Sequence, residues 1–275
     1  MIRARKQFGQ HFLEPVWVDK VIKAIDPRPD QLFIEIGPGP GALTRPLAAR
    51  AQSVTAFEID RDLAAALVAE AIPNLTVVEG DFLEVFSNPH SPIPNPFAGP
   101  CRVAGNLPYN VASPIMFKLV EMHAAGVPLA DATLMLQREV ADRLVAAPGS
   151  KEYGVLSILI GHACDVETVL KLPAGAFRPP PRVLSSLVRL RFRAPQPPVK
   201  DLAMFGRIVQ AVFTRRRKTL SNALLALDDG PPPLLRPPDA LAAAGLDGSR
   251  RPETVSIAEF TRLANAYVPE QRAML

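Results

Sequence analysis

The sequence predicts an α/β fold in two parts: a mostly parallel seven-stranded sheet with an antiparallel edge hairpin, and a small all-α domain after it. Up to about residue 193, short β-branched runs alternate with Ala- and Leu-rich stretches, as in βαβ units that cover both faces of a parallel sheet. Residues 194–198, Ala-Pro-Gln-Pro-Pro, have the composition of a linker. Beyond them the apolar pattern is helical. We therefore expect one domain over residues 1–193 and a helical domain over residues 199–275.

The first part should hold seven strands. A buried apolar run at 32–36 is followed by a glycine-rich turn and a helix, and the same alternation then repeats along the chain. The expected strands are residues 32–36, 53–59, 75–79, 101–105, 132–137, 164–170 and 185–193. The expected helices are residues 42–51, 61–71, 114–125 and 138–146. The last strand alternates apolar and basic residues, and it fits an antiparallel hairpin with the strand before it.

The C-terminal part should hold short helices at 202–213, 219–227, 240–245 and 257–267, the last of them started by Ser256. Two proline-rich segments, 86–100 and 230–238, are expected as irregular surface loops.

Composition indicates a globular protein. Its 275 residues are 48% hydrophobic and 21% charged, which is ample for a core. Cys101 and Cys164 lie in apolar runs and should be buried thiols in a reducing compartment, so we expect neither a disulfide nor a metal site. No apolar run reaches the roughly 18 residues of a membrane span, and the N-terminus lacks the apolar core of a signal peptide. We expect a cytoplasmic monomer.

The net charge of +4 is unevenly placed. Residues 182–218 carry ten basic side chains and one acid, a net charge of +9, which leaves −5 for the rest of the chain. Such a concentrated field suits a polyanion, and nucleic acid is the favoured partner. The alternative is a solvated helix face. The candidate contacts are Arg182, Arg215, Arg216, Arg217 and Lys218.

A glycine-rich turn after the first strand indicates a nucleotide site. Glu35 is followed by Gly37, Gly39 and Gly41, and a helix comes next. Such a strand–turn–helix binds nucleotides in Rossmann-like folds, because glycines let the backbone approach a ligand closely. Glu58 ends the second strand, 21 residues after Gly37, where an acid can take two ribose hydroxyls. Taken alone, this spacing also fits a nicotinamide dinucleotide.

Two further features favour S-adenosylmethionine as the ligand. Glu35 lies two residues before the first glycine, where it can face the charged amino and sulfonium end of that molecule. After the third strand, Asp81 can accept a hydrogen bond from the cofactor adenine, and Phe82 can pack on the ring. The alternative for Asp81 is a turn or a helix N-cap.

Asn106, Leu107, Pro108 and Tyr109 form a motif suited to methylating an adenine amine. That amine is a poor nucleophile because its lone pair is delocalised into the ring. Two acceptors on its hydrogens, the Asn106 side-chain oxygen and a carbonyl of Leu107 or Pro108, would draw the lone pair out of conjugation. Tyr109 would stack on the base. The alternative is an ordinary turn.

Two other segments combine aromatic and polar residues. The run from Arg5 to Leu13, which includes His11, is expected to fold over a ligand; the alternative is a disordered basic tail. Phe177 begins a rigid Phe-Arg-Pro-Pro-Pro segment and is expected as a second stacking face for a flipped base, opposite Tyr109. The alternative is a proline-rich connector.

Taken together, these motifs resemble the KsgA/RsmA family of bacterial 16S ribosomal RNA adenine N6,N6-dimethyltransferases, over nearly the full length. The matching segments are residues 8–13, 35–39, 57–60, 80–81, 105–110, 137–140, 153–154, 177–181 and 213–220. The resemblance implies a class I S-adenosylmethionine-dependent methyltransferase fold and a donor contacted by His11, Leu13, Gly37, Glu58, Asp81 and Asn106. The family often has Asn at the position of His11.

The resemblance further implies two methylations on each of two adjacent adenines near the 3′ end of 16S ribosomal RNA. The substrate would be a nearly assembled small subunit, so the enzyme could double as an assembly checkpoint. Three other classes share parts of this pattern. They are large-subunit adenine methyltransferases of the erythromycin-resistance type, non-catalytic RNA-binding or transcription factors on the same scaffold, and DNA adenine methyltransferases. The basic stretch at 216–220 and the helical tail favour the 16S family, the intact loop at 106–109 favours catalysis, and no additional target-recognition domain is evident.

Overall fold

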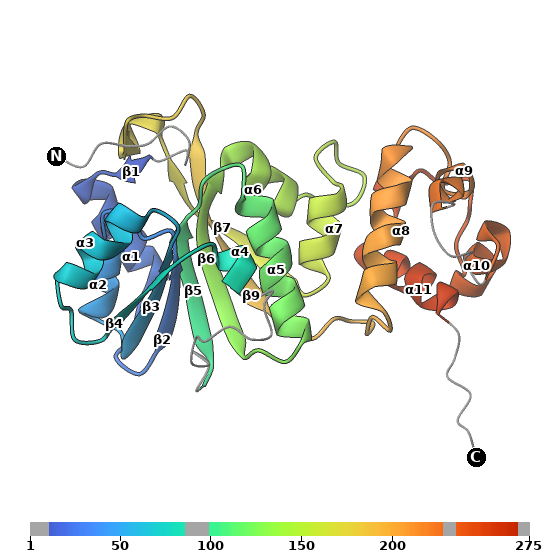
Figure 1. Cartoon of the computed structure of the whole chain (residues 1–275). Coiled ribbons are helices and arrows are strands. Elements are labelled where there is room, and N and C mark those ends of the chain that lie inside the picture. Colours follow the sequence, from blue (N-terminus) through green and yellow to red (C-terminus); the bar gives the residue numbers. More distant parts are fainter. Residues whose placement is uncertain (1–10, 86–98, 228–234, 269–275) are drawn as a thin grey trace, which may run out of the picture. The chain divides into compact units, whose positions relative to one another are not determined.

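The computed structural model describes residues 11–85, 99–227 and 235–268, in two compact units (Figure 1). The first unit comprises residues 1–141 and 165–192, and the second comprises residues 142–164 and 193–275. The longer part of the second unit, residues 193–275, begins at the predicted linker. The shorter part, residues 142–164, was assigned to the first domain in the sequence-based prediction. The predictions for residues 5–10, for most of the loop at 86–100 and for residues 230–234 lie outside the described residues.

The first unit is built on a seven-stranded sheet in the order β4-β3-β2-β5-β6-β9-β7. Its strands are β2 (Leu32–Ile36), β3 (Ser53–Glu58), β4 (Leu75–Glu79), β5 (Cys101–Asn106), β6 (Leu129–Gln137), β7 (Cys164–Leu172) and β9 (Ser185–Phe192). The pairs within β4-β3-β2-β5-β6 are parallel, whereas β9 runs antiparallel to β6. The mostly parallel sheet with an antiparallel strand near one edge is as predicted.

Helices lie on both sides of this sheet. Figure 1 shows α1, α2 and α3 on one side and α4 and α5 on the other. Their bounds are α1 (Pro15–Ile25), α2 (Thr44–Ala48), α3 (Arg61–Ala69), α4 (Phe82–Val85) and α5 (Ala112–Ala124). α1 was not among the predicted helices, although Pro15 at its first turn and the buried residues Val21, Ile22 and Ile25 mark a helix with one apolar face.

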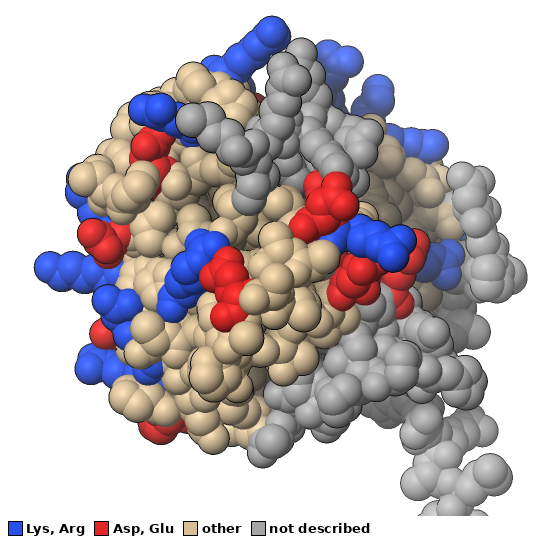
Figure 2. Space-filling view, turned by 60° about the vertical axis from the view of Figure 1, so that its left-hand side comes forward, with Lys and Arg blue, Asp and Glu red and all other residues tan. Residues whose placement is uncertain are grey.

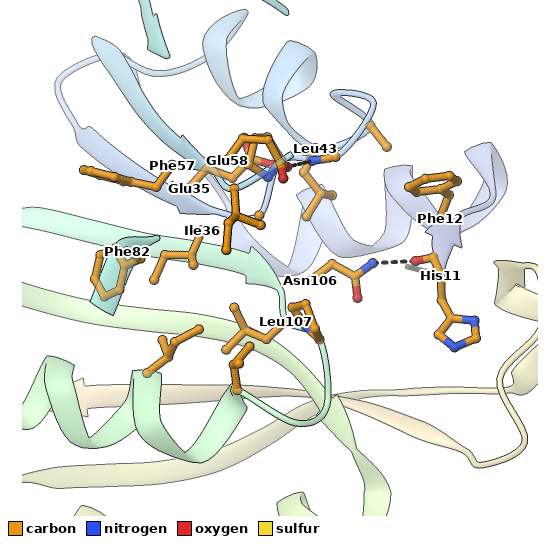
Figure 3. A pocket seen from close by; sticks show the side chains of 18 of the residues that line it. His11, Phe12, Glu35, Ile36, Leu43, Phe57, Glu58, Phe82, Asn106 and Leu107 are labelled. Atoms are coloured by element: carbon orange, nitrogen blue, oxygen red, sulfur yellow. Dashed lines mark hydrogen bonds between the residues drawn. The ribbon is translucent and has the colours of Figure 1, made fainter. Parts of the chain in front are cut away.

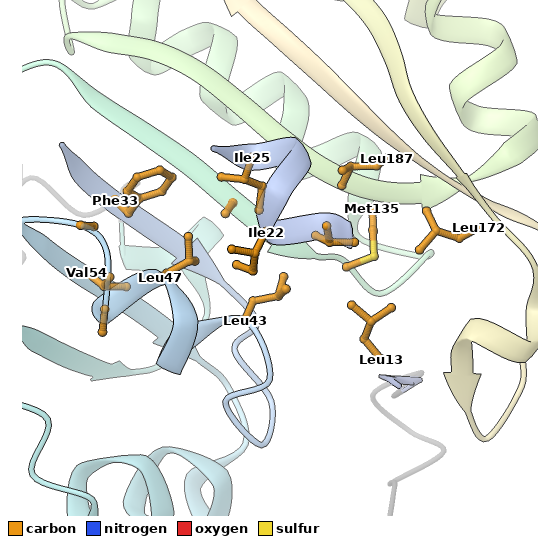
Figure 4. Close-up of a cluster of buried hydrophobic side chains, with 14 of the residues drawn as sticks. Leu13, Ile22, Ile25, Phe33, Leu43, Leu47, Val54, Met135, Leu172 and Leu187 are labelled. Atoms are coloured by element: carbon orange, nitrogen blue, oxygen red, sulfur yellow. The ribbon is translucent and has the colours of Figure 1, made fainter. Parts of the chain in front are cut away.

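A buried apolar cluster joins α1 and α2 to the sheet (Figure 4). Ile22 and Ile25 of α1 and Leu47 of α2 pack with Phe33 and Val54 of the strands. The same cluster holds Leu13, Met135, Leu172, Phe177 and Leu187, so it reaches from the N-terminal segment to the far strands. This packing fixes the strands whose ends carry the candidate site.

A second, two-stranded sheet ties the N-terminal segment to the segment before β9. β1 (Phe12–Leu13) runs antiparallel to β8 (Phe177–Arg178), with Leu13 opposite Phe177. Arg178 also forms an ion pair with Glu14. Two segments about 165 residues apart in sequence, which the sequence analysis treated separately, are therefore neighbours.

The second unit is helical. Its elements are α7 (Val155–Gly161), α8 (Leu202–Thr214), α9 (Leu220–Leu224), the 3-10 turn η3 (Leu225–Leu227), α10 (Pro237–Ala244) and α11 (Ile257–Tyr267), and α6 (Arg138–Leu144) spans the boundary between the units. Ser256 begins α11 as predicted, in a capping box in which its hydroxyl accepts from Glu259 N and Glu259 Oε2 accepts from Ser256 N. α7 was not among the predicted helices. Both cysteines are buried free thiols.

Candidate functional site

The strand order places a crevice at the carboxyl ends of β2 and β5. The strands β3 and β4 lie on one side of β2, whereas β5 and β6 lie on the other. Parallel sheets bind their ligands at such a switch point. Ile36 and Gly105 are paired there, and a Cβ on Gly105 would stand 2.7 Å from Ile36 O, so only glycine fits between the strands. A cavity of about 210 Å³ opens at this edge.

Most of the predicted site residues line this cavity. They are His11, Leu13, Glu35, Gly37, Gly39, Glu58, Asp81, Phe82, Asn106, Leu107, Pro108 and Tyr109. Several apolar lining residues were not predicted as site residues, among them Phe12, Ile36, Leu43, Phe57 and Ile115. In Figure 3, Phe57 and Phe82 lie at one end of the cavity and Asn106 and His11 at the other. The cavity is therefore long enough to separate an apolar end from a polar end.

The glycine turn has the conformation that its composition predicts. Gly37, Gly39 and Gly41 have φ of 68°, 58° and 84°, in the region that favours glycine. Glu58 holds this turn: its Oε2 accepts from Gly39 N at 2.8 Å, and its Oε1 accepts from Asp60 N at 2.9 Å (Figure 3). Burial raises the pKa of the Glu58 carboxyl. Since each carboxylate oxygen has a second lone pair, Glu58 retains acceptors for hydroxyl groups of a ligand.

Glu35 is a buried acid with an unused acceptor. Its side chain is 1% exposed, and its Oε2 has no hydrogen-bond partner among the described residues. Burial raises the pKa of Glu35 to about 8, and the nearby Glu58 carboxylate acts in the same direction. A buried carboxylate oxygen without a hydrogen-bond donor is costly, unless a ligand supplies the missing donor or positive charge.

Asp81 and Phe82 stand where the third predicted strand ends. Asp81 Oδ1 accepts from Leu83 N at 2.9 Å, at the start of α4, so the helix-cap reading of Asp81 is confirmed. Asp81 also lines the cavity, where its other oxygen is available to a ligand. The Phe82 ring meets the Phe57 ring edge-on, with 5.5 Å between ring centroids. These two rings form the apolar end of the cavity.

Asn106 is fixed by a hydrogen bond to the N-terminal segment. Its Nδ2 donates to the His11 main-chain oxygen at 2.8 Å (Figure 3). Because a carbonyl oxygen can only accept, the amide nitrogen must face His11, which leaves Oδ1 as an acceptor. The predicted role of Asn106 needs this oxygen, and His11, directly before β1, holds the amide in one orientation.

Tyr109 is held at its edge, and His11 faces it. Tyr109 Oη lies 3.0 Å from Ser185 Oγ, and the His11 ring lies over Tyr109 with 6.0 Å between centroids and 26° between planes. Phe177, expected at this position, is 3% exposed and packs in the cluster with Leu13 and Leu172. In a two-residue strand alternate side chains face opposite ways, so Phe177 turns into the core while Arg178 faces out. The structure therefore contradicts the prediction that Phe177 is a stacking face opposite Tyr109, because its side chain is buried in the core.

The basic side chains of residues 182–218 divide into two groups. Arg189, Arg191 and Arg193 are bound within the fold: Arg189 and Arg191 pair with Glu167, and Arg193 donates to the carbonyls of Gly161 and His162. Six others are exposed, namely Arg182, Lys200, Arg207, Arg215, Arg217 and Lys218, whereas Arg216 pairs with Glu253. On the face shown in Figure 2, basic and acidic side chains are interspersed. The part of the predicted patch that is open to a polyanion is therefore smaller than the charge count suggested.

The described residues were compared with the requirements of a metal site and of a membrane-spanning helix. No group of three or more His, Cys, Asp or Glu side chains among the described residues is placed to hold a metal ion. Within the same ranges, no helix is both long and apolar enough to cross a membrane.

Comparison with known proteins supports the motif-based resemblance. The family model described as ribosomal RNA adenine dimethylase matches residues 1–235. The chain is 43% identical over 271 residues to the ribosomal RNA small subunit methyltransferase A of Methylibium petroleiphilum, which covers 98% of both chains. It is 42% identical over 273 residues to the protein of the same name from Acinetobacter baylyi, which covers 97% of this chain and 93% of the relative.

Two solved methyltransferase structures resemble this chain over most of its length. A dimethyladenosine transferase from Plasmodium falciparum superposes with a TM-score of 0.73 and 25% identity, over 92% of this chain and 96% of that one. The 23S rRNA methyltransferase ErmE gives a TM-score of 0.64 and 29% identity, over 93% and 98%. The fold is thus the Rossmann-like fold of class I methyltransferases, as predicted. Since the family model spans most of the chain and relatives share 43% of its residues, the protein belongs to the ribosomal RNA adenine dimethylase family.

Proposed function

We propose that the protein transfers methyl groups from S-adenosylmethionine to N6 of two adjacent adenines near the 3′ end of 16S ribosomal RNA, giving N6,N6-dimethyladenosine in the small subunit. The observation that carries this proposal is the fixed amide of Asn106, whose Nδ2 is held by His11 and whose Oδ1 remains an acceptor at the cavity. An acceptor in that place draws the N6 lone pair out of the ring. The proposal includes a monomeric enzyme in the cytoplasm that takes part in subunit biogenesis.

The second acceptor is best supplied by Leu107. The Pro108 carbonyl already accepts from Val111 N at 3.1 Å. Leu107 directly follows Asn106, so its carbonyl lies next to the amide. The Leu107 side chain is buried, at 2% exposure, and this burial holds the turn in place. Asn106 Oδ1 and Leu107 O would then take the two N6 hydrogens, and Tyr109 would hold the ring plane.

The residues of the cavity fit S-adenosylmethionine. When bound, that molecule supplies an activated methyl group on a sulfonium, a good leaving group. Glu35, buried and with its Oε2 unpaired among the described residues, is suited to a cationic amino or sulfonium group. Glu58 has acceptors left for ribose hydroxyls, Asp81 has one for an adenine amine, and Phe57 and Phe82 form an apolar wall for its ring. Transfer by direct displacement then depends on alignment, and it needs neither a metal nor a strong base.

The names of the relatives favour the small subunit as substrate. The relatives at 42–43% identity, over nearly the whole chain, are named as small-subunit methyltransferases, whereas the large-subunit enzyme ErmE is 29% identical. ErmE nonetheless shares the fold, so the large subunit is the alternative substrate to test. A non-catalytic RNA-binding factor is disfavoured because Asn106 and Tyr109 are held in place at the cavity.

The test is incorporation of label from methyl-labelled S-adenosylmethionine into small subunits that lack this modification, with naked 16S RNA and large subunits in parallel. We expect dimethyladenosine in the small subunit alone. Label only in large-subunit RNA would move the protein to the resistance type. Binding to the small subunit without any label would favour an assembly or transcription factor.

Glu35 predicts a pH dependence of cofactor binding. Its pKa of about 8 keeps the free carboxyl protonated at lower pH, whereas a bound ammonium favours the carboxylate, so binding releases a proton. The affinity for S-adenosylhomocysteine should rise by up to about tenfold per pH unit from roughly pH 6 to 7.5, where the ligand amine is still charged. Titration calorimetry across this range measures it. Glu35→Gln should bind more weakly and with a flat profile; equal slopes in both proteins would contradict the role of Glu35.

The exposed basic residues after α8 predict how binding responds to salt. Changing Arg215, Arg217 and Lys218 to Gln should weaken binding to the small subunit by about tenfold or more and should reduce the slope of log affinity against log salt by about 2. The matched control changes Lys20, Lys23 and Arg50, three exposed basic residues of the first unit. Filter binding over a salt series provides the comparison. Equal slopes for the two triple variants would remove these residues from the RNA interface.

A further inference from the structure

We propose that Thr44 is a positioning residue for Glu35: its buried hydroxyl donates a hydrogen bond to the Glu35 carboxylate and so favours the charged form that binds the cationic end of S-adenosylmethionine. This inference rests on the proposed methyl donor and adds a residue behind the same site. The family resemblance assigns Thr44 no contact with the donor. Three observations support the inference: the unpaired hydroxyl of Thr44, the unpaired oxygen of Glu35, and the place of Thr44 outside the cavity lining.

The Thr44 hydroxyl is a buried polar group at the start of a helix. Thr44 is 0% exposed and is the first residue of α2, shortly after the glycine turn. Its Oγ1 has no hydrogen-bond partner among the described residues, and no side-chain hydrogen bond caps α2. Burying a hydroxyl without a partner costs free energy, so a role in a polar contact is expected for it.

Glu35 is the neighbour that can use this hydroxyl. Its Oε2 is also buried without a partner among the described residues. Burial raises the pKa of Glu35 to about 8, and the Thr44 hydroxyl is the strongest influence in the opposite direction. A hydroxyl beside a carboxyl has this effect because it can donate to the charged form. The two groups therefore adjoin without a completed hydrogen bond, and a charged carboxylate would draw the hydroxyl hydrogen into one.

A hydroxyl suits a carboxyl that changes its charge when a ligand binds. By rotating one hydrogen, the Thr44 hydroxyl can accept from the protonated carboxyl and donate to the carboxylate. Glu35 lines the cavity, whereas Thr44 is not among the lining residues. Thr44 would therefore act on the methyl donor only through Glu35.

The other charged groups near Glu35 do not replace this hydroxyl. The Glu58 carboxylate, at the end of β3, raises the pKa of Glu35 further. Arg45 of α2 lowers it, but less than Thr44 does. The Arg45 side chain is 49% exposed and donates to Glu70, with 2.8 Å between Nε and Oε2. Its charge is therefore partly neutralised by Glu70 and screened by water.

The experiment compares Thr44→Val, which removes the hydroxyl at nearly the same shape, with Thr44→Ser, which keeps it. Calorimetry with S-adenosylhomocysteine over roughly pH 6 to 7.5 measures affinity. NMR of the labelled glutamate carboxyl carbons, assigned with Glu35→Gln, follows the titration of Glu35 in the protein alone. We expect Thr44→Val to raise the midpoint of this titration by about one pH unit and therefore to weaken binding about tenfold across the range. Thr44→Ser should bind within about threefold of the wild type.

Two controls show whether the loss passes through Glu35. In the Glu35→Gln background, Thr44→Val should change the affinity by less than about threefold, because the carboxyl on which Thr44 acts is gone. Thr261→Val removes another buried threonine hydroxyl, which lies on α11 in the other unit and donates to Ile257 O at 3.1 Å. This second control should leave both the affinity and the Glu35 titration unchanged.

Each other outcome overturns the inference in a recognisable way. An unmoved Glu35 titration in Thr44→Val would show that the hydroxyl does not act on Glu35. Equal losses in Thr44→Val and Thr44→Ser would assign the effect to the packing of α2, and an undiminished loss in the Glu35→Gln background would assign it to the glycine turn. Absence of S-adenosylhomocysteine binding by the wild-type chain would instead overturn the proposed donor, while the Glu35 titration would still decide whether Thr44 acts on Glu35.

Discussion

Replacing Asn106 by Ala is expected to lower kcat for adenine methylation by about 10²- to 10³-fold, the usual cost of removing one preorganised hydrogen-bonding group that acts on developing charge. The loss should fall on turnover, because Asn106 Oδ1 acts on the amine as it becomes a nucleophile. The affinity for S-adenosylhomocysteine should fall less than about tenfold, since Glu35, Glu58 and Asp81 remain in the cavity. Single-turnover kinetics with unmodified small subunits, and calorimetry with the donor product, measure the two effects separately.

The matched control for this prediction is Asn222→Ala, which removes an exposed amide on α9 in the other unit. It should leave kcat within about twofold. A second variant, Asn106→Asp, keeps an acceptor oxygen but loses the Nδ2 donor to His11 O, so its oxygen is no longer held in one orientation. We expect it to lie between the wild type and Asn106→Ala. Near-normal turnover of Asn106→Ala would remove the central support for the proposed reaction.

The parts of the site that follow strand ends could be predicted from the sequence. The turn at Gly37, the acid at Glu58, the pair at Asp81 and Phe82, and the loop from Asn106 all lie at or just after the end of a predicted strand. Parallel strands bring such positions to one edge of the sheet. The sequence therefore predicted both the edge and the residue types that line it. It did not predict that Glu58 holds the glycine turn, because that contact depends on where β3 ends in space.

The parts that the sequence could not predict depend on short or long-range pairing. β1 and β8 are two residues each, too short to show a period, so their pairing and the inward position of Phe177 had no sequence signal. The basic run was over-interpreted for a related reason. Arg189 and Arg191 form ion pairs with Glu167, and Arg193 donates to a main-chain carbonyl, and these partners are distant in sequence.

Replacing Asp131 by Ala is expected to lower the free energy of unfolding by about 3–5 kcal/mol, the range for breaking a buried ion pair. Asp131 lies on β6 opposite Arg102 of β5, with both carboxylate oxygens 3.0 Å from Arg102 Nε. The same guanidinium donates to Ile25 O and Asp26 O, where α1 ends. Without Asp131, the Arg102 side chain, 10% exposed, would remain buried with no counter-charge.

Chemical denaturation at neutral pH measures this loss, with Asp30→Ala as the control because Asp30 is an exposed acid in a nearby turn. The control should change the free energy of unfolding by less than about 0.5 kcal/mol. A loss below about 1 kcal/mol for Asp131→Ala would mean that Arg102 is adequately held by main-chain carbonyls and Gln31 alone.

The substitutions Asp131→Ala and Asn106→Ala affect opposite ends of β5, the first of them through Arg102. Arg102 stands near the start of β5 and Asn106 at its end, so the charge network and the candidate catalytic amide are separated by the length of the strand. Asp131→Ala should therefore reduce stability while the folded fraction keeps its kcat, and Asn106→Ala should reduce kcat with little change in stability. If each variant changed both quantities, the strand would not separate the two roles. In that case the loss of turnover in Asn106→Ala would have to be corrected for unfolding before it could be assigned to the chemistry.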